Sequence, residues 1–345
     1  EIYEPQYYID AKTKEIIDEW ENAMSFDGTG PGGNEKIGRH DFGQDLPNLD
    51  ITKQRTNCRL ENKKVRTIDA TEETETNSTN TAYAFPCPEN TEKEVNGGYS
   101  PLNDAHYYGT ATYNMFQEWF TKGPLNKAKI VLKTHYEEEP GVSWANAKWY
   151  NNEKLIRFGD GNTSIYPLST DPNVVAHEIG HGFTHLNSKL AYSKMTGGMN
   201  EAYSDMAGEA VEYYLTGAND WMVGGGIKKT RSPLRYLDDP SKDNISINHA
   251  DNYQDNMDVH YSSGVYNKAF YLLATKPGWN TQKAFEVMTF ANKRYWRKVS
   301  TFNEAECGVE KAAKYKKYSV ADVTDAFQEV GVACAHDDGD AGGGG

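Results

Sequence analysis

The pattern of hydrophobic and polar positions divides the chain into two halves of different character. Before residue 172, short apolar runs at 129–136 and 154–158 predict strands, and one helix is expected over 104–120. After residue 172, helical periodicity dominates. The helices expected there cover residues 172–187, 200–215, 263–275, 282–296 and 320–330. The expected fold class is therefore α+β, with a β-rich N-terminal half and a mainly helical C-terminal half.

The two ends of the chain differ from its middle. Residues 7–20 follow a pattern of strand, polar turn and strand, and the glycines between 28 and 33 then interrupt it. Residues 1–25 are therefore expected to form a small separate piece. Residues 336–345 are acidic and rich in glycine, which is typical of a flexible tail. Residues 69–80 are polar and predict an exposed loop.

Length and composition narrow the class of protein. A chain of 345 residues favours two domains, and 37% hydrophobic with 25% charged residues is typical of a globular protein. No apolar run approaches the roughly 18 residues of a membrane-spanning helix. The net charge of −14 disfavours nucleic acid as a main partner. The first residues lack the pattern of a signal peptide, so the sequence is expected to start within a longer precursor or to be an artificial fragment.

The four cysteines fall into two local pairs, Cys58 with Cys87 and Cys307 with Cys334. None belongs to a CxxC motif, which disfavours zinc ribbons and thioredoxin-like redox sites. Two local disulfides formed in an oxidising compartment are the simplest interpretation. Four buried free thiols in a cytosolic enzyme are the alternative.

The sequence His-Glu-Ile-Gly-His, which begins at His177, carries the strongest chemical signal. On a helix, His177 and His181 lie on the same face with their Cβ atoms about 5–6 Å apart. Both imidazoles can therefore bind one Zn²⁺. Glu178 can hold and deprotonate the metal-bound water. Asp171 as N-cap and Pro172 as the first helical residue predict that the motif lies on a helix.

A catalytic zinc needs a third protein ligand. The extended HExxHxxGxxH pattern fails, because Thr184 and Asn187 stand where glycine and histidine are required. Glu201 and Asp205 lie four residues apart among apolar neighbours, and a carboxylate on the apolar face of a helix needs a partner. Glu201 is therefore expected as the third ligand and Asp205 as the residue that orients a ligand histidine. Asn200 is a candidate helix cap. For Glu201 and Asp205, the alternative is that they form a solvated acidic face.

These motifs together resemble the thermolysin family of secreted neutral metallopeptidases. The resemblance rests on HExxH followed by Gly-Gly-Met-Asn-Glu-Ala-Tyr-Ser-Asp at 197–205, covers about residues 28–334, and is greatest for the bacterial elastase and vibriolysin branch. The two cysteine pairs also match that branch. The resemblance implies a two-domain fold with a zinc cleft between the domains. The implied parts are a propeptide remnant (1–25), a β-rich peptidase domain ending in the HExxH helix (26–187), a helical peptidase domain (188–335) and a flexible tail (336–345).

The resemblance also implies roles for residues outside the two motifs. His260, in the segment that begins at Asp258, is implied as a catalytic residue, with Tyr192 and the zinc sharing the stabilisation of the oxyanion. Asp258 or Asp255 is expected to orient His260. Arg235 and Asn146 are implied to hold the substrate backbone. The implied substrate-binding residues are Asn146, Ala147, Trp149, Arg235, Val174, Val223, Ile227 and Leu234, the last four residues of this list forming an apolar pocket.

A structural calcium site is expected near the end of the helix that carries Glu201. Several oxygen ligands on one short stretch are what Ca²⁺ prefers. The expected ligands are Asn173, Glu209, Glu212, Asp220 and the carbonyl of Met222. Asn173 stands where the family has an aspartate, which should weaken the affinity for calcium, and Asp171 is a candidate substitute. An exposed acidic helix end is the alternative.

The resulting expectation is a secreted, extracellular zinc endopeptidase that cleaves on the amino side of bulky hydrophobic residues. The cofactors are one catalytic Zn²⁺ and at least one structural Ca²⁺. The expected partners are protein or peptide substrates and the chain's own propeptide, removed by cleavage within 22–27, and the enzyme is expected to be a monomer. A zinc aminopeptidase is disfavoured because no Gly-x-Met-Glu-Asn segment precedes His177. A catalytically silent binding protein is disfavoured because Glu178 and His260 are intact.

Overall fold

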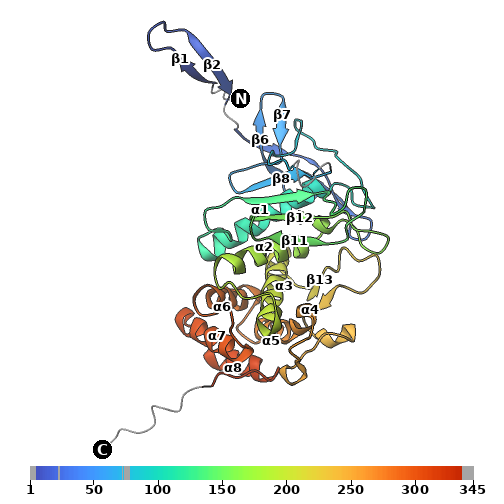
Figure 1. The fold of residues 1–345 in the computed structure, drawn as a ribbon, viewed down its shortest axis with the longest axis vertical. Coiled ribbons are helices and arrows are strands. Elements are labelled where there is room, and N and C mark those ends of the chain that lie inside the picture. Colours follow the sequence, from blue (N-terminus) through green and yellow to red (C-terminus); the bar gives the residue numbers. More distant parts are fainter. Residues whose placement is uncertain (1–4, 22–23, 72, 74–77, 336–345) are drawn as a thin grey trace, which may run out of the picture. The chain divides into compact units, whose positions relative to one another are not determined.

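The computed structural model describes residues 5–21, 24–71, 73 and 78–335 (Figure 1). The expected tail at 336–345 and part of the expected loop at 69–80 lie outside these residues. The contacts within the chain define two compact units, each assembled from three segments. Unit 1 comprises Glu1–Thr110, Lys129–Asn146 and Arg157–Thr170, and unit 2 comprises Ala111–Ala128, Ala147–Ile156 and Asp171–Gly345.

Unit 1 is built mainly of short strands. One four-stranded sheet is antiparallel in the order β3 (Met24–Gly28), β6 (Leu49–Gln54), β7 (Asn57–Arg59) and β9 (Ala84–Pro86). Strand β4 (Gly30–Asn34) pairs antiparallel with β5 (Gly38–Phe42), and β8 (Val65–Asp69) pairs in parallel with β10 (Ile130–Thr134). Leu49 and Ile51 alternate with less buried residues along β6, so one face of this strand enters the core.

The N-terminal segment forms a hairpin of β1 (Pro5–Ile9) and β2 (Ile16–Glu21), which pair antiparallel. The carboxylate of Asp10 closes the turn by accepting hydrogen bonds from the backbone amides of Lys12 (2.7 Å) and Thr13 (3.0 Å). The strand, turn and strand predicted for residues 7–20 are therefore confirmed.

Unit 2 is mainly helical. Its helices are the end of α1 (Pro101–Phe120), α2 (Pro172–Leu186), α3 (Lys194–Thr216), α4 (Val259–Ser262), α5 (Gly264–Ala274), α6 (Thr281–Arg294), α7 (Phe302–Lys316) and α8 (Val320–Gln328). The short strands β13 (Met222–Val223) and β14 (Arg235–Tyr236) pair antiparallel. Strand β11 (Ala147–Tyr150) also belongs to this unit, whereas the boundary between the units falls within β12 (Leu155–Phe158).

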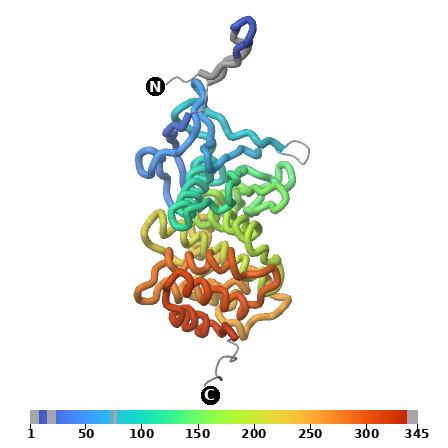
Figure 2. The backbone as a smooth tube through the Cα atoms, turned by 90° about the vertical axis from the view of Figure 1, so that its left-hand side faces the viewer, coloured from blue at the N-terminus to red at the C-terminus, as the bar shows by residue number. Residues whose placement is uncertain are grey.

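Helix α3 forms the centre of unit 2. Met199, Tyr203, Met206 and Ala210 on this helix are fully buried in one apolar cluster with side chains of α2, α5 and α6. The aromatic ring of Tyr203 stacks on Phe285 of α6, with ring centroids 5.6 Å apart. Helices α6, α7 and α8 follow one another at the C-terminal end of the unit in both views (Figures 1 and 2). A helix buried on all sides is suited to carry polar groups that must be kept from water.

The predicted elements agree with the structure in most places. Strands β10 and β12 confirm the runs at 129–136 and 154–158, and α1, α2, α5, α6 and α8 confirm five predicted helices to within a few residues. Helix α7 was not predicted. Its middle contains Gly308, where a Cβ would come within 2.8 Å of Tyr295, so the packing requires glycine at this position. Glycine has a low helix propensity and therefore weakens the helical pattern in the sequence. Thr301 and Glu304 form a capping box at its start, the signal that identifies this helix.

Grouping by contacts divides the chain by a different criterion from the expected domain division, which stays a prediction. The predicted boundary placed α2 in an N-terminal domain ending at residue 187, whereas by contacts α2 belongs to unit 2. The reason is that Ala176 and Phe183 of α2 pack into the same apolar cluster as α3.

Both cysteine pairs form disulfides, Cys58–Cys87 and Cys307–Cys334, so the alternative of four free thiols is wrong. Among the described residues, no helix has the length and apolar character needed to cross a membrane.

Candidate zinc and catalytic site

Helix α2 carries the HExxH motif and begins as the sequence predicts. Asp171 is the N-cap and its carboxylate accepts a hydrogen bond from the amide of Asn173 (2.9 Å), with Pro172 at the first helical position. One turn apart on the buried face, His177 and His181 bring their Nε2 atoms to 3.0 Å of each other. Two imidazoles therefore point their Nε2 atoms at one place.

Glu201 on α3 reaches the same place because the two helices approach closely. At Gly180, a Cβ would come within 2.8 Å of the Cα of Ser204, so only glycine permits this approach. The carboxylate oxygens of Glu201 lie 3.4 Å from Nε2 of His177 and 3.3 Å from Nε2 of His181. Glu201 is fully buried, and its Oε2 has no hydrogen-bond partner among the described residues. A buried carboxylate oxygen that accepts no hydrogen bond is suited to bind a cation.

The other nitrogen of each imidazole is held by a partner on α3. Nδ1 of His177 donates to Asp205 Oδ1 (2.8 Å), and Nδ1 of His181 donates to Asn200 Oδ1 (2.8 Å). The amide group of Asn200 is oriented by its own bond from Nδ2 to the carbonyl of Leu190 (3.3 Å). With both Nδ1 atoms occupied as donors, both Nε2 atoms are the ones that can bind a metal.

This donor set fits zinc. Two imidazole nitrogens and one carboxylate oxygen leave a fourth position free, which is the pattern of a catalytic rather than a structural zinc. The charges around His177 agree with a cation site. Burial alone would lower the pKa of His177, but Asp205 and Glu201 raise it to about 10. The carboxylates thus stabilise positive charge at this point. Burial would likewise raise the pKa of Glu201, yet His181 and His177 hold it well below its usual range.

The positive charge of Arg235 balances the negative charge of Asp205, the partner of His177. Arg235 lies on β14, opposite Val223 of β13, and its guanidinium donates to both oxygens of Asp205, from Nε at 2.8 Å and from Nη2 at 2.6 Å. The amide of Asn267 on α5 also donates to Asp205 (2.8 Å). Burial would raise the pKa of Asp205, but Arg235 and His177 keep it well below its usual range, so this carboxylate is a fixed acceptor for His177.

Glu178 lies beside the proposed ligands. It has an oxygen within 4.8 Å of a nitrogen of His177 and a nitrogen of His181. Its Oε2 accepts a hydrogen bond from the backbone amide of Trp149 on β11 (2.8 Å). The Trp149 ring packs against α2, where a Cβ at Gly182 would come within 3.1 Å of it. The carboxylate of Glu178 is therefore held in place by a neutral backbone amide and not by an ion pair.

Two further residues approach Glu201, Tyr192 from the segment before α3 and His260 from α4. The phenol of Tyr192 donates to Glu201 Oε1 (2.5 Å) and lies 3.4 Å from Nε2 of His260. That nitrogen of His260 is 3.5 Å from Glu201 Oε2. Two glycines of α3 make room for α4, because a Cβ at Gly197 would come within 2.3 Å of Val259, and Gly198 is similarly close to α4.

The choice between Asp258 and Asp255 is decided by the structure. Asp258 accepts hydrogen bonds from both the backbone amide (2.9 Å) and Nδ1 (2.7 Å) of His260. Asp255 instead pairs with Lys194 (2.7 Å) and accepts from Tyr253 (3.2 Å). Of the two alternatives, Asp258 is therefore the one that contacts His260, because the carboxylate of Asp255 is directed to a different pair of partners.

The remaining predicted substrate residues lie as follows. Asn146 belongs to unit 1, where its carbonyl accepts from the amide of Gly159 (3.0 Å), and Ala147 begins β11. The residues of the expected apolar pocket belong to unit 2. Val174, Val223 and Ile227 are buried, and the amide of Leu234 donates to the carbonyl of Val223 (2.9 Å).

The predicted calcium ligands also gather in one place. Glu209, Glu212 and Asp220 have oxygens within 4.8 Å of one another. Burial, followed by the charges of Glu212 and Asp220, raises the pKa of Glu209 well above its usual range. Burial and Asp220 raise the pKa of Glu212 to about 7. Three acidic groups, of which Glu209 is buried and Asp220 is exposed, therefore lie together, and among the described residues no basic side chain forms an ion pair with them.

Asn173 and Asp171 differ in their availability to a cation at this cluster. Asn173 donates from Nδ2 to the carbonyl of Met222 (3.1 Å), which leaves its Oδ1 buried without a partner among the described residues. Both oxygens of Asp171 already accept backbone hydrogen bonds, from Asn173 and from Gly226 (2.9 Å each). Asn173 is the better placed of the two to contribute an oxygen.

Sequence reasoning assigned one residue of this site to a different role. Asn200 was a candidate helix cap, but α3 begins at Lys194, and Asn200 lies inside the helix and holds His181. The glycines at 197 and 198 suggested a later start, whereas the structure uses them for close packing. Asn267 was not considered. No local signal distinguishes it, because its partner Asp205 lies on another helix.

Comparison with known proteins places this fold and site in the class of thermolysin-type metallopeptidases. The family model described as thermolysin metallopeptidase, catalytic domain, matches residues 35–185, and the model for the α-helical domain matches residues 188–332. The chain belongs to the thermolysin family of zinc metallopeptidases. The thermolysin-like two-domain α+β fold is thereby confirmed.

Among the curated relatives, a neutral protease of Vibrio proteolyticus is 49% identical over 95% of this chain and 53% of its own length. A hemagglutinin/proteinase of Vibrio cholerae is 47% identical over the same shares. The chain thus spans about half the length of these relatives. A solved structure, the precursor of protealysin from Serratia proteamaculans, is similar with a TM-score of 0.66 at 24% identity, covering 78% of this chain and 88% of that one.

Proposed function

We propose that the chain is a zinc-dependent endopeptidase that hydrolyses peptide bonds on the amino side of bulky hydrophobic residues. The observation that carries the proposal is the convergence of His177, His181 and Glu201 on one point, with the carboxylate of Glu178 beside it. The relatives named neutral protease and zinc metalloproteinase support the same conclusion.

The residues around this point divide the chemistry between them. His177, His181 and Glu201 hold the zinc, which when bound polarises the scissile carbonyl and acidifies water. Glu178, oriented by the Trp149 amide, takes a proton from the attacking water and passes it to the leaving amine.

His260 and Tyr192 stabilise the charge that develops on the scissile carbonyl oxygen. Asp258 accepts from Nδ1 of His260 (2.7 Å) and thereby leaves Nε2 as the nitrogen that faces the site. The phenol of Tyr192 lies 3.4 Å from this nitrogen. Two hydrogen-bond donors from separate segments are thus proposed to bind the scissile carbonyl oxygen. Neither residue is a proposed metal ligand.

Substrate recognition is proposed to use Asn146 of unit 1 together with residues of unit 2. Arg235 is fixed by Asp205, which suits it to hold a substrate carbonyl, and Asn146 of unit 1 is proposed to bind the substrate backbone. Val174, Val223, Ile227 and Leu234 are proposed to form an apolar pocket for the residue after the scissile bond. The hydrogen bond from the amide of Leu234 to the carbonyl of Val223 (2.9 Å), which brings two of these residues side by side, supports that assignment.

We further propose that Glu209, Glu212, Asp220, Asn173 and the Met222 carbonyl bind a structural Ca²⁺. The buried, unpartnered oxygens of Glu209 and Asn173 support a cation at this point. The two disulfides support secretion into an oxidising compartment. Residues 1–25 are proposed to be a propeptide remnant released by cleavage within 22–27, and the enzyme is proposed to act as a monomer.

The test is cleavage of a peptide blocked at both ends, with leucine or phenylalanine after the scissile bond, together with zinc content. Cleavage should stop on removal of zinc and return when zinc is added back. Glu178→Gln should keep zinc but lose about 10²–10⁴-fold in turnover, the usual contribution of a general base. Glu138→Gln, which makes the same change at an exposed position, should leave turnover unchanged.

Cleavage only of peptides with a free amino terminus would favour an aminopeptidase. Zinc binding without any cleavage would favour a catalytically silent binding protein. Normal turnover in Glu178→Gln would show that another residue is the base.

A further inference from the structure

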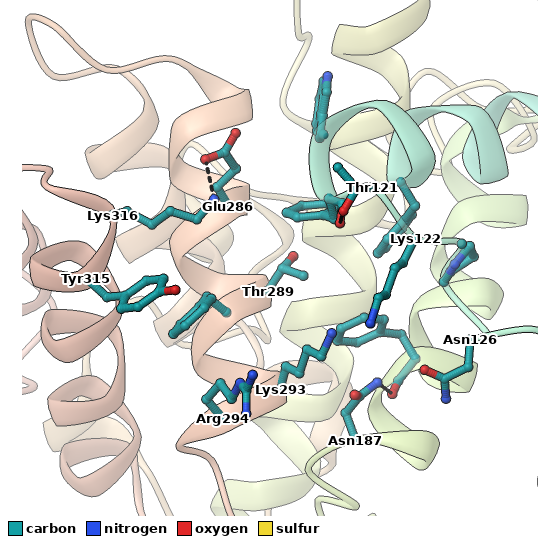
Figure 3. A pocket seen from close by; sticks show the side chains of 17 residues that line it. Thr121, Lys122, Asn126, Asn187, Glu286, Thr289, Lys293, Arg294, Tyr315 and Lys316 are labelled. Atoms are coloured by element: carbon teal, nitrogen blue, oxygen red, sulfur yellow. Dashed lines mark hydrogen bonds and ion pairs between the residues drawn. The ribbon is translucent and has the colours of Figure 1, made fainter.

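A second cavity lies within unit 2, between helices α1, α2, α6 and α7 (Figure 3). Its volume is about 330 Å³, at the lower end of the range of roughly 300–1,000 Å³ that is typical of small-ligand sites. None of the proposed zinc, calcium or catalytic residues lines it. This cavity is therefore not part of the proposed active site.

The walls of the cavity are aromatic. Phe116, Trp119 and Phe120 come from α1, Phe183 from α2 and Phe290 from α6. The rings of Phe116 and Phe183 contact each other, with centroids 5.6 Å apart. Such walls favour an apolar ligand body of small size.

At the side formed by α6 and α7, Phe290 stacks on Tyr315 with centroids 4.5 Å apart. Tyr315 is 66% exposed, so an aromatic surface continues from the cavity to its mouth.

Two of the polar groups in the walls, Thr289 and Glu286, already have partners. Thr289 shares a hydrogen bond with Tyr203 (3.1 Å). Glu286 accepts from Lys316 and from Tyr318 (3.0 Å each). The one carboxylate in the lining is therefore directed to partners of its own.

The rim of the cavity is cationic and uncompensated. Lys122, Lys293 and Arg294 line it, and no carboxylate pairs with any of them in the part of the chain that the structure describes. Figure 3 shows the side chains of Lys122 and Lys293 extending into the same region of the cavity. Burial, with the charges of Lys122 and Arg294, lowers the pKa of Lys293. Three neighbouring cations without a counter-charge are unusual on a chain with a net charge of −14.

We propose that this cavity binds a small amphipathic carboxylate, with its apolar body against the phenylalanines and its carboxylate between Lys122 and Lys293. A hydrogen bond from an ammonium to a carboxylate is stronger than one between neutral groups, and here the anion also relieves repulsion between the cations. The same chemistry is offered by a medium-chain fatty acid and by the apolar C-terminal residue of a peptide. A neutral ligand of the same shape gains no charge pairing at the rim, and a cationic ligand is repelled there.

The test is isothermal titration calorimetry with four probes: octanoate, octanol, octylammonium and N-acetyl-phenylalanine. The protein is the zinc-loaded Glu178→Gln variant, which suppresses self-digestion. Octanoate should bind with one-to-one stoichiometry and about tenfold or more tighter than octanol, as expected for gaining a hydrogen bond to a charged group. Octylammonium should not bind. Tighter binding of octanoate than of N-acetyl-phenylalanine identifies a fatty acid as the source, and the reverse order identifies a peptide end.

The double variant Lys122→Met/Lys293→Met should weaken octanoate binding about tenfold or more, while leaving octanol binding unchanged. Both lysines are exposed, so the variant is expected to fold, and unchanged octanol binding reports that the apolar cavity is intact. Lys311→Met on α7 makes the same change at an exposed position outside the cavity and should have no effect. Equal binding of octanoate and octanol, or no octanoate binding at all, would overturn the proposal. So would octanoate binding that the double variant does not change.

Discussion

Two stretches of helix α3 place carboxylates in opposite electrostatic surroundings. In the first, Glu201 and Asp205 are fully buried and accompanied by two histidines and Arg235. About two turns after Glu201, Glu209 is equally buried, but its neighbours are Glu212 and Asp220, which are acidic as well. The same side-chain chemistry therefore faces basic side chains in one stretch and acidic side chains in the other.

The difference appears in the protonation of these groups. Despite burial, the cationic neighbours hold the pKa of Glu201 and Asp205 below the usual range. Burial and acidic neighbours raise the pKa of Glu209 and Glu212 above it. The first cluster is thus partly balanced by the protein itself, whereas the second is the one proposed to bind a cation from outside. This contrast leads to four predictions.

The largest effect is expected when the first cluster loses its third ligand. Glu201→Ala leaves two imidazoles, an incomplete zinc site, so the affinity for zinc should fall by more than the roughly 100-fold typical of supporting residues. Zinc content after dialysis at low free zinc measures this loss. Glu212→Ala, on the same helix but in the second cluster, should keep its zinc. Full occupancy in Glu201→Ala would place the third ligand elsewhere.

A smaller effect is expected from the residue behind the ligands. Asp205→Asn removes the charge that orients His177 and pairs with Arg235. Zinc affinity or turnover should fall about 10–100-fold, and saturating zinc should restore the occupancy. Competition with a chelator of known affinity gives the change. A variant that matched the parent in both affinity and turnover would argue against a positioning role for Asp205.

The second cluster should respond to calcium instead of zinc. In the Glu178→Gln background, added Ca²⁺ should raise the melting temperature, with a stabilisation of about 2.7 kcal/mol at a hundredfold excess over Kd. Glu209→Gln should abolish the response. Asn173→Asp should shift it to lower calcium, since it adds a negative ligand, whereas Asn252→Asp at an exposed position should not. A midpoint that does not move with calcium would remove the calcium site.

The smallest effect is expected at a buried acid that belongs to neither cluster. Burial, followed by the charge of Glu310, raises the pKa of Glu306 on α7 to about 8. A raised pKa favours the protonated acid in the folded state, so this group stabilises the fold below its unfolded pKa of about 4.5. That stabilisation is lost as the pH rises towards 8.

Glu306→Gln should therefore flatten the fall in melting temperature between pH 5 and about pH 8. Glu304→Gln would disturb the capping box of α7, so the exposed Glu329→Gln is the better control and should leave the pH dependence unchanged. An identical pH profile in Glu306→Gln and the parent would show that this carboxyl has an ordinary pKa.

The sequence alone determined the local parts of this protein. The spacing of His177, Glu178 and His181 is meaningful only on a helix, and the Asp171-Pro172 start predicts that helix. The helical periodicity after residue 172 and the pairing of the cysteines were likewise recognisable. In each case the signal depends on residues close together in the chain, or on a resemblance to the thermolysin family.

Only the tertiary structure decided which distant residues meet. It selects Asp258 over Asp255, assigns Asn200 to His181, and directs the Trp149 amide to Glu178. These partners depend on how closely helices and strands approach. The approach is controlled by contacts such as that of Gly180 with α3, which no periodicity reveals. Hydrogen bonds act over about 3 Å, so a partner is defined only when the packing of the surrounding segments is complete.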